Sequence, residues 1–139
     1  MSVNLKSYAF CAKGAIPAMR KAGGGSIVNV ASVRSIVVGG GTLQYDTAKH
    51  AVAGLTRGLA IDHGAEGIRV NCIAPGLVKT EFARALWDDP KFLRASEQSA
   101  ALGRIAGPDE MAGAVVYFAS AASSFVTGQT LVMDGGRLL

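Results

Sequence analysis

The chain has 139 residues, of which half are hydrophobic, and it carries 14 basic and 10 acidic residues for a net charge of +4. This length fits one domain, and the apolar content is sufficient for a core. The basic residues are scattered along the chain and the aromatic residues, 6% of the total, do not alternate with them. We therefore expect no nucleic-acid binding.

Cysteine content and hydropathy limit the cellular setting. Cys11 and Cys72 are too few for a disulfide framework or a metal site, and free thiols are typical of a reducing cytoplasm. No positively charged and then apolar leader opens the chain, so we expect no export signal. The uncharged run 111–133 is interrupted by serine, threonine, glycine and glutamine. A buried helix, a loop and a short strand explain this run better than a membrane span, and a cytoplasmic protein is expected.

The first segment is predicted to be an amphipathic helix, because apolar residues recur at steps of three and four. They are Leu5, Tyr8, Ala9, Ala12, Ile16 and Met19. Pro17 removes one backbone donor and is expected to bend or loosen this helix. The glycines 23–25 end it; they lack the spacing of a phosphate-binding loop and are predicted to form a turn.

The next stretch combines a strand, a loop and a second helix. Residues 26–31 are almost all apolar and predict a buried parallel strand, which Ser32 follows directly. A glycine-containing loop over 35–42 leads into a helix that carries Tyr45 and Lys49. Small residues on the other faces of this helix would allow another helix to approach closely; they are Ala51, Ala53, Gly54, Gly58 and Ala60.

Tyr45 and Lys49 are the first candidates for catalysis. Side chains at i and i+4 share one helical face, about 5–6 Å apart at Cβ. An ammonium at that distance stabilises the phenolate form of the tyrosine and favours general acid–base catalysis. Ser32 follows a strand at the edge where open α/β sheets bind ligands, and its hydroxyl could hold a substrate oxygen. A solvated lysine beside a half-buried tyrosine is the alternative interpretation of the same spacing.

The second half of the chain predicts two further strands. Residues 68–74 form one, ended by Pro75 and Gly76, and residues 126–133 form the other. The irregular segment 81–107 predicts one or two short helices, and Pro108 begins another helix. The chain is therefore predicted to be one α/β domain over 1–139, with about three parallel strands and flanking helices, which is half of a doubly wound sheet.

These motifs together resemble the short-chain dehydrogenase/reductase family. GSIVNVAS followed by YDTAKHAVAGLTRGLA is similar to its catalytic serine strand and Tyr-x-x-x-Lys helix. IRVNCIAPGLVKTEF, FVTGQTLVMDGG and MSVNLKSYAFCAKGAIPAM match three further segments in the same order. The resemblance implies the C-terminal part of a Rossmann-like fold and hydride transfer between NAD or NADP and a small-molecule carbonyl or secondary alcohol.

The resemblance also implies a catalytic role for each of four residues. Tyr45 would be the acid/base and would also contact the cofactor, while Lys49 would stabilise its phenolate and hold the cofactor ribose. Ser32 would position the substrate oxygen. Asn4 would hold a water on a proton path to Lys49, although an asparagine near a helix start is also an ordinary capping residue.

Cofactor-binding and substrate-binding segments follow from the same resemblance. The turn after the second strand would wrap the nicotinamide, through Pro75, Gly76, Val78 and Thr80. Segment 81–107 would be a mobile substrate lid, in which Trp87 either contacts substrate or packs against the lid itself.

One departure from the family pattern leaves a second hypothesis open. The chain contains no glycine-rich strand-to-helix turn for the cofactor pyrophosphate and no residue after it to bind the ribose. Family members carry about as much chain again before the position of Met1. The alternative is therefore a non-catalytic half that acts only as an association module. The resemblance also implies a homo-oligomer built through the Tyr45 helix.

Overall fold

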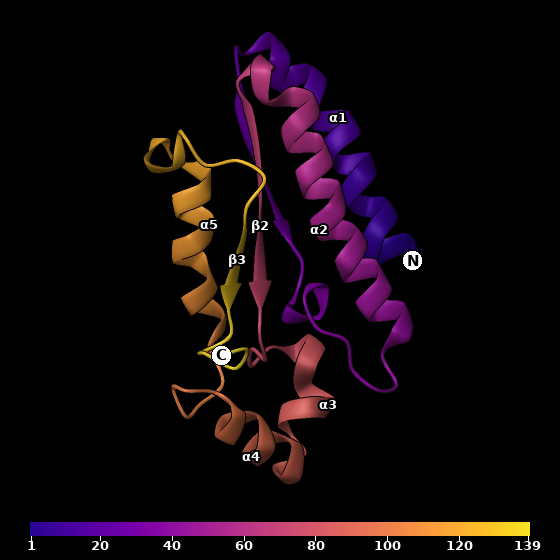
Figure 1. The fold of residues 1–139 in the computed structure, drawn as a ribbon, viewed down its shortest axis with the longest axis vertical. Coiled ribbons are helices and arrows are strands. Elements are labelled where there is room, and N and C mark those ends of the chain that lie inside the picture. The colour runs from indigo at the N-terminus through magenta and orange to yellow at the C-terminus, as the bar shows by residue number, and fades with distance from the viewer.

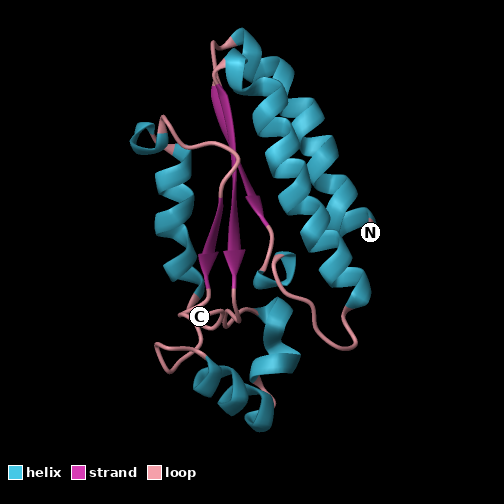
Figure 2. Ribbon diagram, in the orientation of Figure 1, coloured by secondary structure: helices cyan, strands magenta, loops and turns pink.

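A three-stranded parallel sheet forms the centre of the protein. The computed structural model describes the whole chain except for the side chain of Ser2. Strands β1 (Gly25–Val30), β2 (Ile68–Pro75) and β3 (Thr130–Met133) lie side by side in this order, so β2 is central. All three point the same way (Figure 2), and their carboxyl ends therefore meet at one edge of the sheet.

Five α-helices surround this sheet. Helices α1 (Ser7–Lys21) and α2 (Leu43–His63) lie side by side over one face, and α5 (Ala112–Ala119) covers the other (Figure 1). The short helices α3 (Arg84–Trp87) and α4 (Pro90–Ser99) lie beyond the carboxyl ends of the strands. This arrangement confirms the predicted fold class of three parallel strands with flanking helices. Within the described part of the chain, no helix is both long and apolar enough to cross a membrane.

The alternation of side chains along β2 explains why both faces of the sheet are covered. Ile68, Val70 and Cys72 pack with residues of α1 and α2, whereas Ile73 packs with Phe118 of α5. Successive side chains of a strand point to opposite faces, so a strand between two helical layers must be apolar on both. The nearly continuous apolar sequence of this strand is a consequence of that constraint.

The third strand is shorter than predicted. The prediction covered 126–133, but regular pairing is confined to Thr130–Met133. In the preceding stretch the buried side chain of Asn71 donates to the Val126 carbonyl at 2.8 Å and accepts from the Gln129 N–H at 3.0 Å. The Asn71 side chain therefore replaces main-chain hydrogen bonds between β2 and residues 126–129. An apolar sequence alone does not show at which residue main-chain pairing with β2 begins.

The turn predicted at the glycine triplet is confirmed and has a steric cause. Gly24 has a φ of 146°, and a Cβ on it would lie 2.7 Å from the Gly67 carbonyl oxygen. The turn before β1 and the turn before β2 therefore touch at Gly24 and Gly67, and the Gly25 N–H donates to the same Gly67 carbonyl at 3.1 Å. Only glycine fits this close approach of backbones.

The start of the first helical segment is irregular. A π-helical turn, η1 (Ser2–Lys6), contains Asn4 and leads directly into α1. Pro17 lies inside α1 without ending it. Single π-helical turns within helices are frequent at functional sites.

Asn71 is predicted to hold the 126–129 stretch against β2. Replacing it in Asn71→Leu leaves the Val126 carbonyl and the Gln129 N–H without their side-chain partner. Since each unsatisfied buried group costs about 1–3 kcal/mol, the free energy of unfolding should fall by roughly 2–4 kcal/mol. Urea denaturation measures the change, with Lys13→Ala on the exposed face of α1 as the control. A loss no larger than that of the control would contradict the assigned role.

Candidate active site

Helix α2 carries two of the four predicted catalytic residues and contacts the elements that carry the other two. It carries Tyr45 and Lys49 and packs against β2. The 3-10 turn η2 (Val33–Ser35), which Ser32 caps, packs against α2 as well, and so does the π-helical turn that contains Asn4. The elements that carry all four residues are therefore joined through one helix.

Lys49 occupies a buried position between two aromatic rings and the end of β1. Only 6% of its surface is exposed. Its Nζ donates to the Val30 carbonyl at 2.9 Å and to the Tyr8 hydroxyl at 3.3 Å. It lies 5.4 Å from the ring centroid of Tyr8 and 5.6 Å from that of Tyr45. Both distances are within the range of cation–π attraction, so the ammonium is held by carbonyl, hydroxyl and ring together.

Burial changes the proton affinities in this cluster. It lowers the pKa of Lys49, and the nearby Cys72 thiol partly opposes that shift. It raises the pKa of Tyr8, an effect to which Cys72 and Tyr45 add. The lysine therefore releases a proton more readily than a solvent-exposed lysine does, while Tyr8 keeps its hydroxyl proton.

Ser32 marks the end of β1 and is itself buried. Its Oγ accepts from the Arg34 N–H at 3.2 Å, and its carbonyl accepts from the Ser35 hydroxyl at 2.6 Å. It is therefore the N-cap of η2, and this local structure fixes the serine backbone. The contact uses a lone pair of Oγ and leaves its O–H group as a donor.

The side chain of Asp46 anchors the loop that precedes α2. It is 2% exposed and accepts from the Gly39 N–H at 2.8 Å and from the Thr42 hydroxyl at 3.0 Å. The Arg34 Nε lies 3.8 Å from its other oxygen. Burial acts to raise the pKa of Asp46, but the hydrogen bonds and Arg34 outweigh it and hold the pKa below its usual range. The residue next to Tyr45 thus holds the glycine loop to the first turn of the helix.

The turn after β2 lies tightly against the end of β3. The Gly76 N–H donates to the Met133 carbonyl at 3.0 Å. A Cβ on Gly76 would lie 2.9 Å from the Asp134 Cα, a distance that real Cβ contacts essentially never show. Glycine is required here because two backbones meet, and the Pro75–Gly76 pair is fixed by packing.

Val78 and Thr80 connect this turn to the segment predicted as a lid. Val78 forms a single parallel bridge with Ala106, so the start and end of that segment are joined. Thr80 caps the 3-10 turn η4 (Glu81–Ala83), accepting from the Ala83 N–H at 3.4 Å. Its carbonyl accepts from the indole N–H of Trp87 at 2.8 Å.

The helices predicted within 81–107 are present as η4, α3 and α4. Trp87 packs against its own segment and the turn before it, because the Arg84 guanidinium lies 5.6 Å from its ring and Lys79 Nζ lies 5.3 Å from it. Of the two interpretations of Trp87, these contacts favour packing within the segment. The tryptophan nevertheless lies next to Thr80, since its indole N–H donates to the Thr80 carbonyl.

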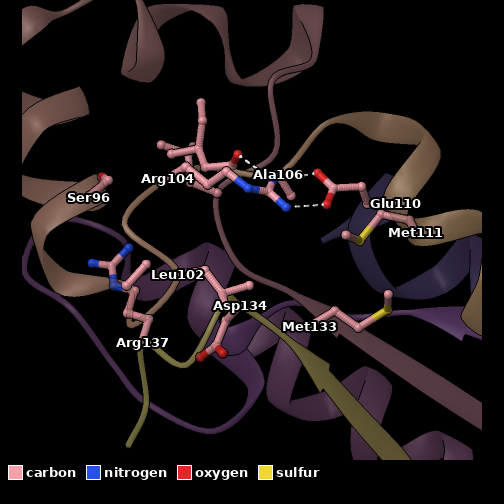
Figure 3. Close-up of a pocket in the computed structure, with 13 residues that line it drawn as sticks. Ser96, Leu102, Arg104, Ala106, Glu110, Met111, Met133, Asp134 and Arg137 are labelled. Carbon is pink, nitrogen blue, oxygen red and sulfur yellow. Dashed lines mark hydrogen bonds and ion pairs between the residues drawn. The ribbon is translucent and has the colours of Figure 1, made fainter.

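A pocket of about 180 Å³ opens between this segment and the end of β3 (Figure 3). Arg104 and Glu110 form one side of it through a bidentate pair, with N–O distances of 2.8 and 2.7 Å. The Arg104 guanidinium and the Gly107 N–H lower the pKa of Glu110 to about 2. Met133 and Asp134 lie across from this pair. Tyr45, Lys49 and Ser32 do not line this pocket, so it is separate from the lysine cluster.

Sequence reasoning missed the roles of two residues, Tyr8 beside Lys49 and Asp46 in the loop anchor before α2. Tyr8 lies in the apolar stripe of the first helix, where its ring was expected to be core, and nothing in the pattern showed where its hydroxyl would bond. Asp46 follows Tyr45 directly, and an acidic residue in the first turn of a helix is usually explained by the helix dipole alone. Its position after a glycine loop was the signal that could have indicated an anchoring role.

A parallel sheet with helices on both faces is the fold that this chain shares with the proteins it resembles. A family model described as enoyl-(acyl carrier protein) reductase matches residues 1–137. The dehydrogenase/reductase SDR family member 4 of Oryctolagus cuniculus is 41% identical over 98% of this chain and 52% of its own length. A cis-4-hydroxycyclohexanecarboxylate dehydrogenase of Sinomonas cyclohexanicum is also 41% identical, over 98% of this chain and 54% of its own.

Solved structures agree with these relatives. A gluconate 5-dehydrogenase from Burkholderia cenocepacia in complex with NADP and tartrate has a TM-score of 0.97 and 40% identity, covering 99% of this chain and 54% of that one. The chain belongs to the short-chain dehydrogenase/reductase family. It spans about half the length of the relatives it matches.

Removing the Asp46 carboxylate is predicted to free the loop before α2. In Asp46→Ala the Gly39 N–H loses its acceptor, so its hydrogen exchange should become at least tenfold faster. In the unchanged chain, acidification through the lowered pKa of Asp46 should reduce the protection factor of this N–H, which is its intrinsic exchange rate divided by the observed rate, because the anchored form of the carboxyl is the ionised one. Amide exchange followed by NMR measures both, with Asp62→Ala on the exposed side of α2 as the control. Equal exchange in both variants would contradict the anchoring role.

Proposed function

We propose that the chain supplies the catalytic half of an NAD(P)-dependent oxidoreductase that transfers a hydride between the nicotinamide and a small-molecule carbonyl or secondary alcohol. The observation that carries this proposal is the buried Lys49 ammonium, 5.6 Å from the Tyr45 ring on the same face of α2. A cation beside a phenol stabilises the negative charge that develops on the phenol oxygen while a proton is transferred.

In this proposal each residue of the cluster has a separate task. Tyr45 gives a proton to the substrate oxygen or takes one from it. Ser32 donates its hydroxyl to the same oxygen from the end of β1, where its backbone is fixed by η2. Lys49 stabilises the phenolate and donates to the cofactor ribose. Asn4, in the π-helical turn packed on α2, holds the water of the proton path to Lys49.

The turn after β2 fits the nicotinamide end of the cofactor. Within the described part of the chain no group accepts a hydrogen bond from the Val78 N–H, so it can donate to the carboxamide. The Thr80 hydroxyl accepts only a long contact from Ala83, at 3.4 Å, and can donate to the cofactor. Pro75 and Gly76 hold the backbone of this turn against β3. When bound, the nicotinamide supplies or accepts the hydride.

Related structures support both the cofactor and the substrate class. Besides the gluconate 5-dehydrogenase, a protein described as a putative 2-deoxy-D-gluconate 3-dehydrogenase from Agrobacterium tumefaciens contains bound NADP, and it is 40% identical to this chain. These proteins are named for small alcohols or their oxidised forms, which matches a hydroxyl-binding Ser32 and Tyr45. We propose that segment 81–107 closes over such a substrate as part of one domain covering 1–139.

An alternative function is that of a non-catalytic association module. The observation favouring it is a groove of about 370 Å³ between α1 and β1, lined from Ser7 to Met19 and from Ser26 to Val30. Within the described chain β1 has a neighbouring strand on one side only, so its other edge can pair with a strand from elsewhere. In this alternative the Tyr45 cluster has no chemical role.

Cofactor titration separates the two functions. Trp87 is the single tryptophan of the chain and bonds to Thr80, so its fluorescence should be quenched saturably by NADPH or NADH. Tyr45→Phe should retain this binding but lower turnover of a carbonyl substrate by at least a thousandfold, because the phenyl ring cannot transfer a proton. Tyr117→Phe on α5 is the matched control. Absence of quenching, or full turnover by Tyr45→Phe, would count against the catalytic proposal.

Self-association through α2 is part of the proposal. Leu43 and Ile61 are 80% and 82% exposed, and they share one face of the helix with Gly54 and Gly58. A Cβ on either glycine would touch nothing in the described chain. This smooth face suits close packing against the same helix of a second copy.

A large side chain on this face should weaken such a dimer without disturbing the fold. Gly54→Leu is expected to raise the dimer dissociation constant at least tenfold, since the helices could no longer approach closely. Sedimentation velocity measures the change. Gly14→Leu is the matched control, because Gly14 is also a helical glycine facing open space. Equal association by the two variants would refute an interface at α2.

A further inference from the structure

The outer edge of β1 ends in a carbonyl group that faces away from the sheet. Gly25 N–H donates to Gly67 and Ala31 N–H donates to the Ile73 carbonyl, so these residues direct their polar groups toward β2. Because the direction alternates along a strand, Val30 directs its N–H and C=O to the opposite side. No strand of the described chain lies on that side.

Two side chains satisfy this outward carbonyl. The Tyr8 hydroxyl donates to it at 2.8 Å, and Lys49 Nζ donates to it at 2.9 Å. Lys49 also donates to the Tyr8 oxygen at 3.3 Å. The three groups therefore form a closed triangle in which each contacts the other two.

We propose that Tyr8 is a positioning residue for Lys49, whose hydroxyl and ring hold the ammonium beside Tyr45. The inference rests on the proposed function, because it gives Tyr8 its effect through the Tyr45–Lys49 pair. Lysine has a flexible four-carbon stem and a compact charge, so one hydrogen bond does not fix the ammonium. The Val30 carbonyl and the Tyr8 oxygen accept from two of the three N–H groups of the ammonium, and the third N–H stays available to a ribose or a water.

The contact between Tyr8 and Lys49 is important because few other groups near Lys49 can stabilise its charge. The groups that can ionise around it are Tyr8 from α1, Tyr45 from α2 itself and Cys72 from β2. Among the described residues no carboxylate lies within ion-pair distance of Lys49. Neutral acceptors alone therefore keep a buried ammonium charged, and the Tyr8 oxygen is one of the two that the structure gives it.

Tyr8 also distinguishes this chain's arrangement from a simple Tyr–Lys pair. Its hydroxyl proton is committed to Val30, which orients a lone pair of its oxygen toward Lys49. Its ring centroid lies 5.4 Å from Nζ, nearly as close as that of Tyr45. Two phenol rings therefore confine the same ammonium, one from each of the two helices packed on this face of the sheet.

Tyr8→Phe tests the inference because it keeps the ring and removes only the hydroxyl. The measurement is the side-chain NMR titration of isotope-labelled Lys49. With one acceptor lost, the charged form of Lys49 is less stable, so the titration midpoint should move to lower pH than in the unchanged chain. Tyr117→Phe is the matched control and should leave the midpoint where it is. An unchanged or raised midpoint in Tyr8→Phe would overturn the inference, and Tyr8→Met provides a second variant without a hydroxyl.

A kinetic arm separates this inference from the proposed function. If the chain turns over substrate, Tyr8→Phe should lower kcat roughly tenfold or more, the effect of losing one hydrogen bond to a charged group, with little change in KM. The pH at which kcat begins to change should move in step with the Lys49 midpoint. A shifted midpoint together with full turnover by Tyr45→Phe would refute the proposed function and leave the contact between Tyr8 and Lys49 established. An unchanged midpoint with inactive Tyr45→Phe would refute only the role of Tyr8.

Discussion

The structure of the candidate site depends on the burial of one ammonium group, that of Lys49, which needs hydrogen-bond acceptors inside the protein. A charged side chain removed from water must find acceptors or lose its proton, because the interior stabilises it less than water does. Lys49 finds a main-chain carbonyl, a phenol oxygen and two aromatic rings. These partners come from α1, α2 and β1, so one ammonium contacts all three elements. The ammonium is held by neutral groups, which leaves its charge available to a neighbouring phenol.

The parallel sheet determines where this cluster lies. Parallel strands bring their carboxyl ends to one edge, and the β1 end, the turn after β2 and the end of β3 are therefore neighbours. Side chains from loops at this edge are positioned by local devices, such as the cap formed by Ser32 and the anchor formed by Asp46. Close backbone contacts fix the turn at Gly76 in the same way. The candidate residues lie in irregular loops, and these local contacts at the strand ends hold the backbone of the loops in place.

The open edge of β1 links the two hypotheses about function. The chain spans about half the length of its relatives, and β1 has a groove instead of a strand on its outer side. The same edge presents the Val30 carbonyl to which Lys49 and Tyr8 bond. Any strand that pairs with β1 at this point competes with Lys49 for that carbonyl. Pairing of another strand with β1 would therefore affect the position of Lys49, because both would use the Val30 carbonyl oxygen.

The sequence by itself determined the order and type of the elements, because hydrophobic periodicity and glycine or proline punctuation are local signals. It correctly predicted three parallel strands, the helix with Tyr45 and Lys49, and the short helices of 81–107. It was wrong in predicting a buried first strand, because within the described chain β1 has a neighbouring strand on one side only and most of its residues are half-buried. It overestimated β3, since the side chain of Asn71 replaces main-chain pairing before Thr130. Only the tertiary structure decided that Lys49 is buried, that Tyr8 turns its hydroxyl to Val30, and that Asp46 anchors a loop. These facts depend on contacts between residues far apart in the chain, such as Tyr8 and Lys49, and no local pattern encodes which buried oxygen a given donor will reach.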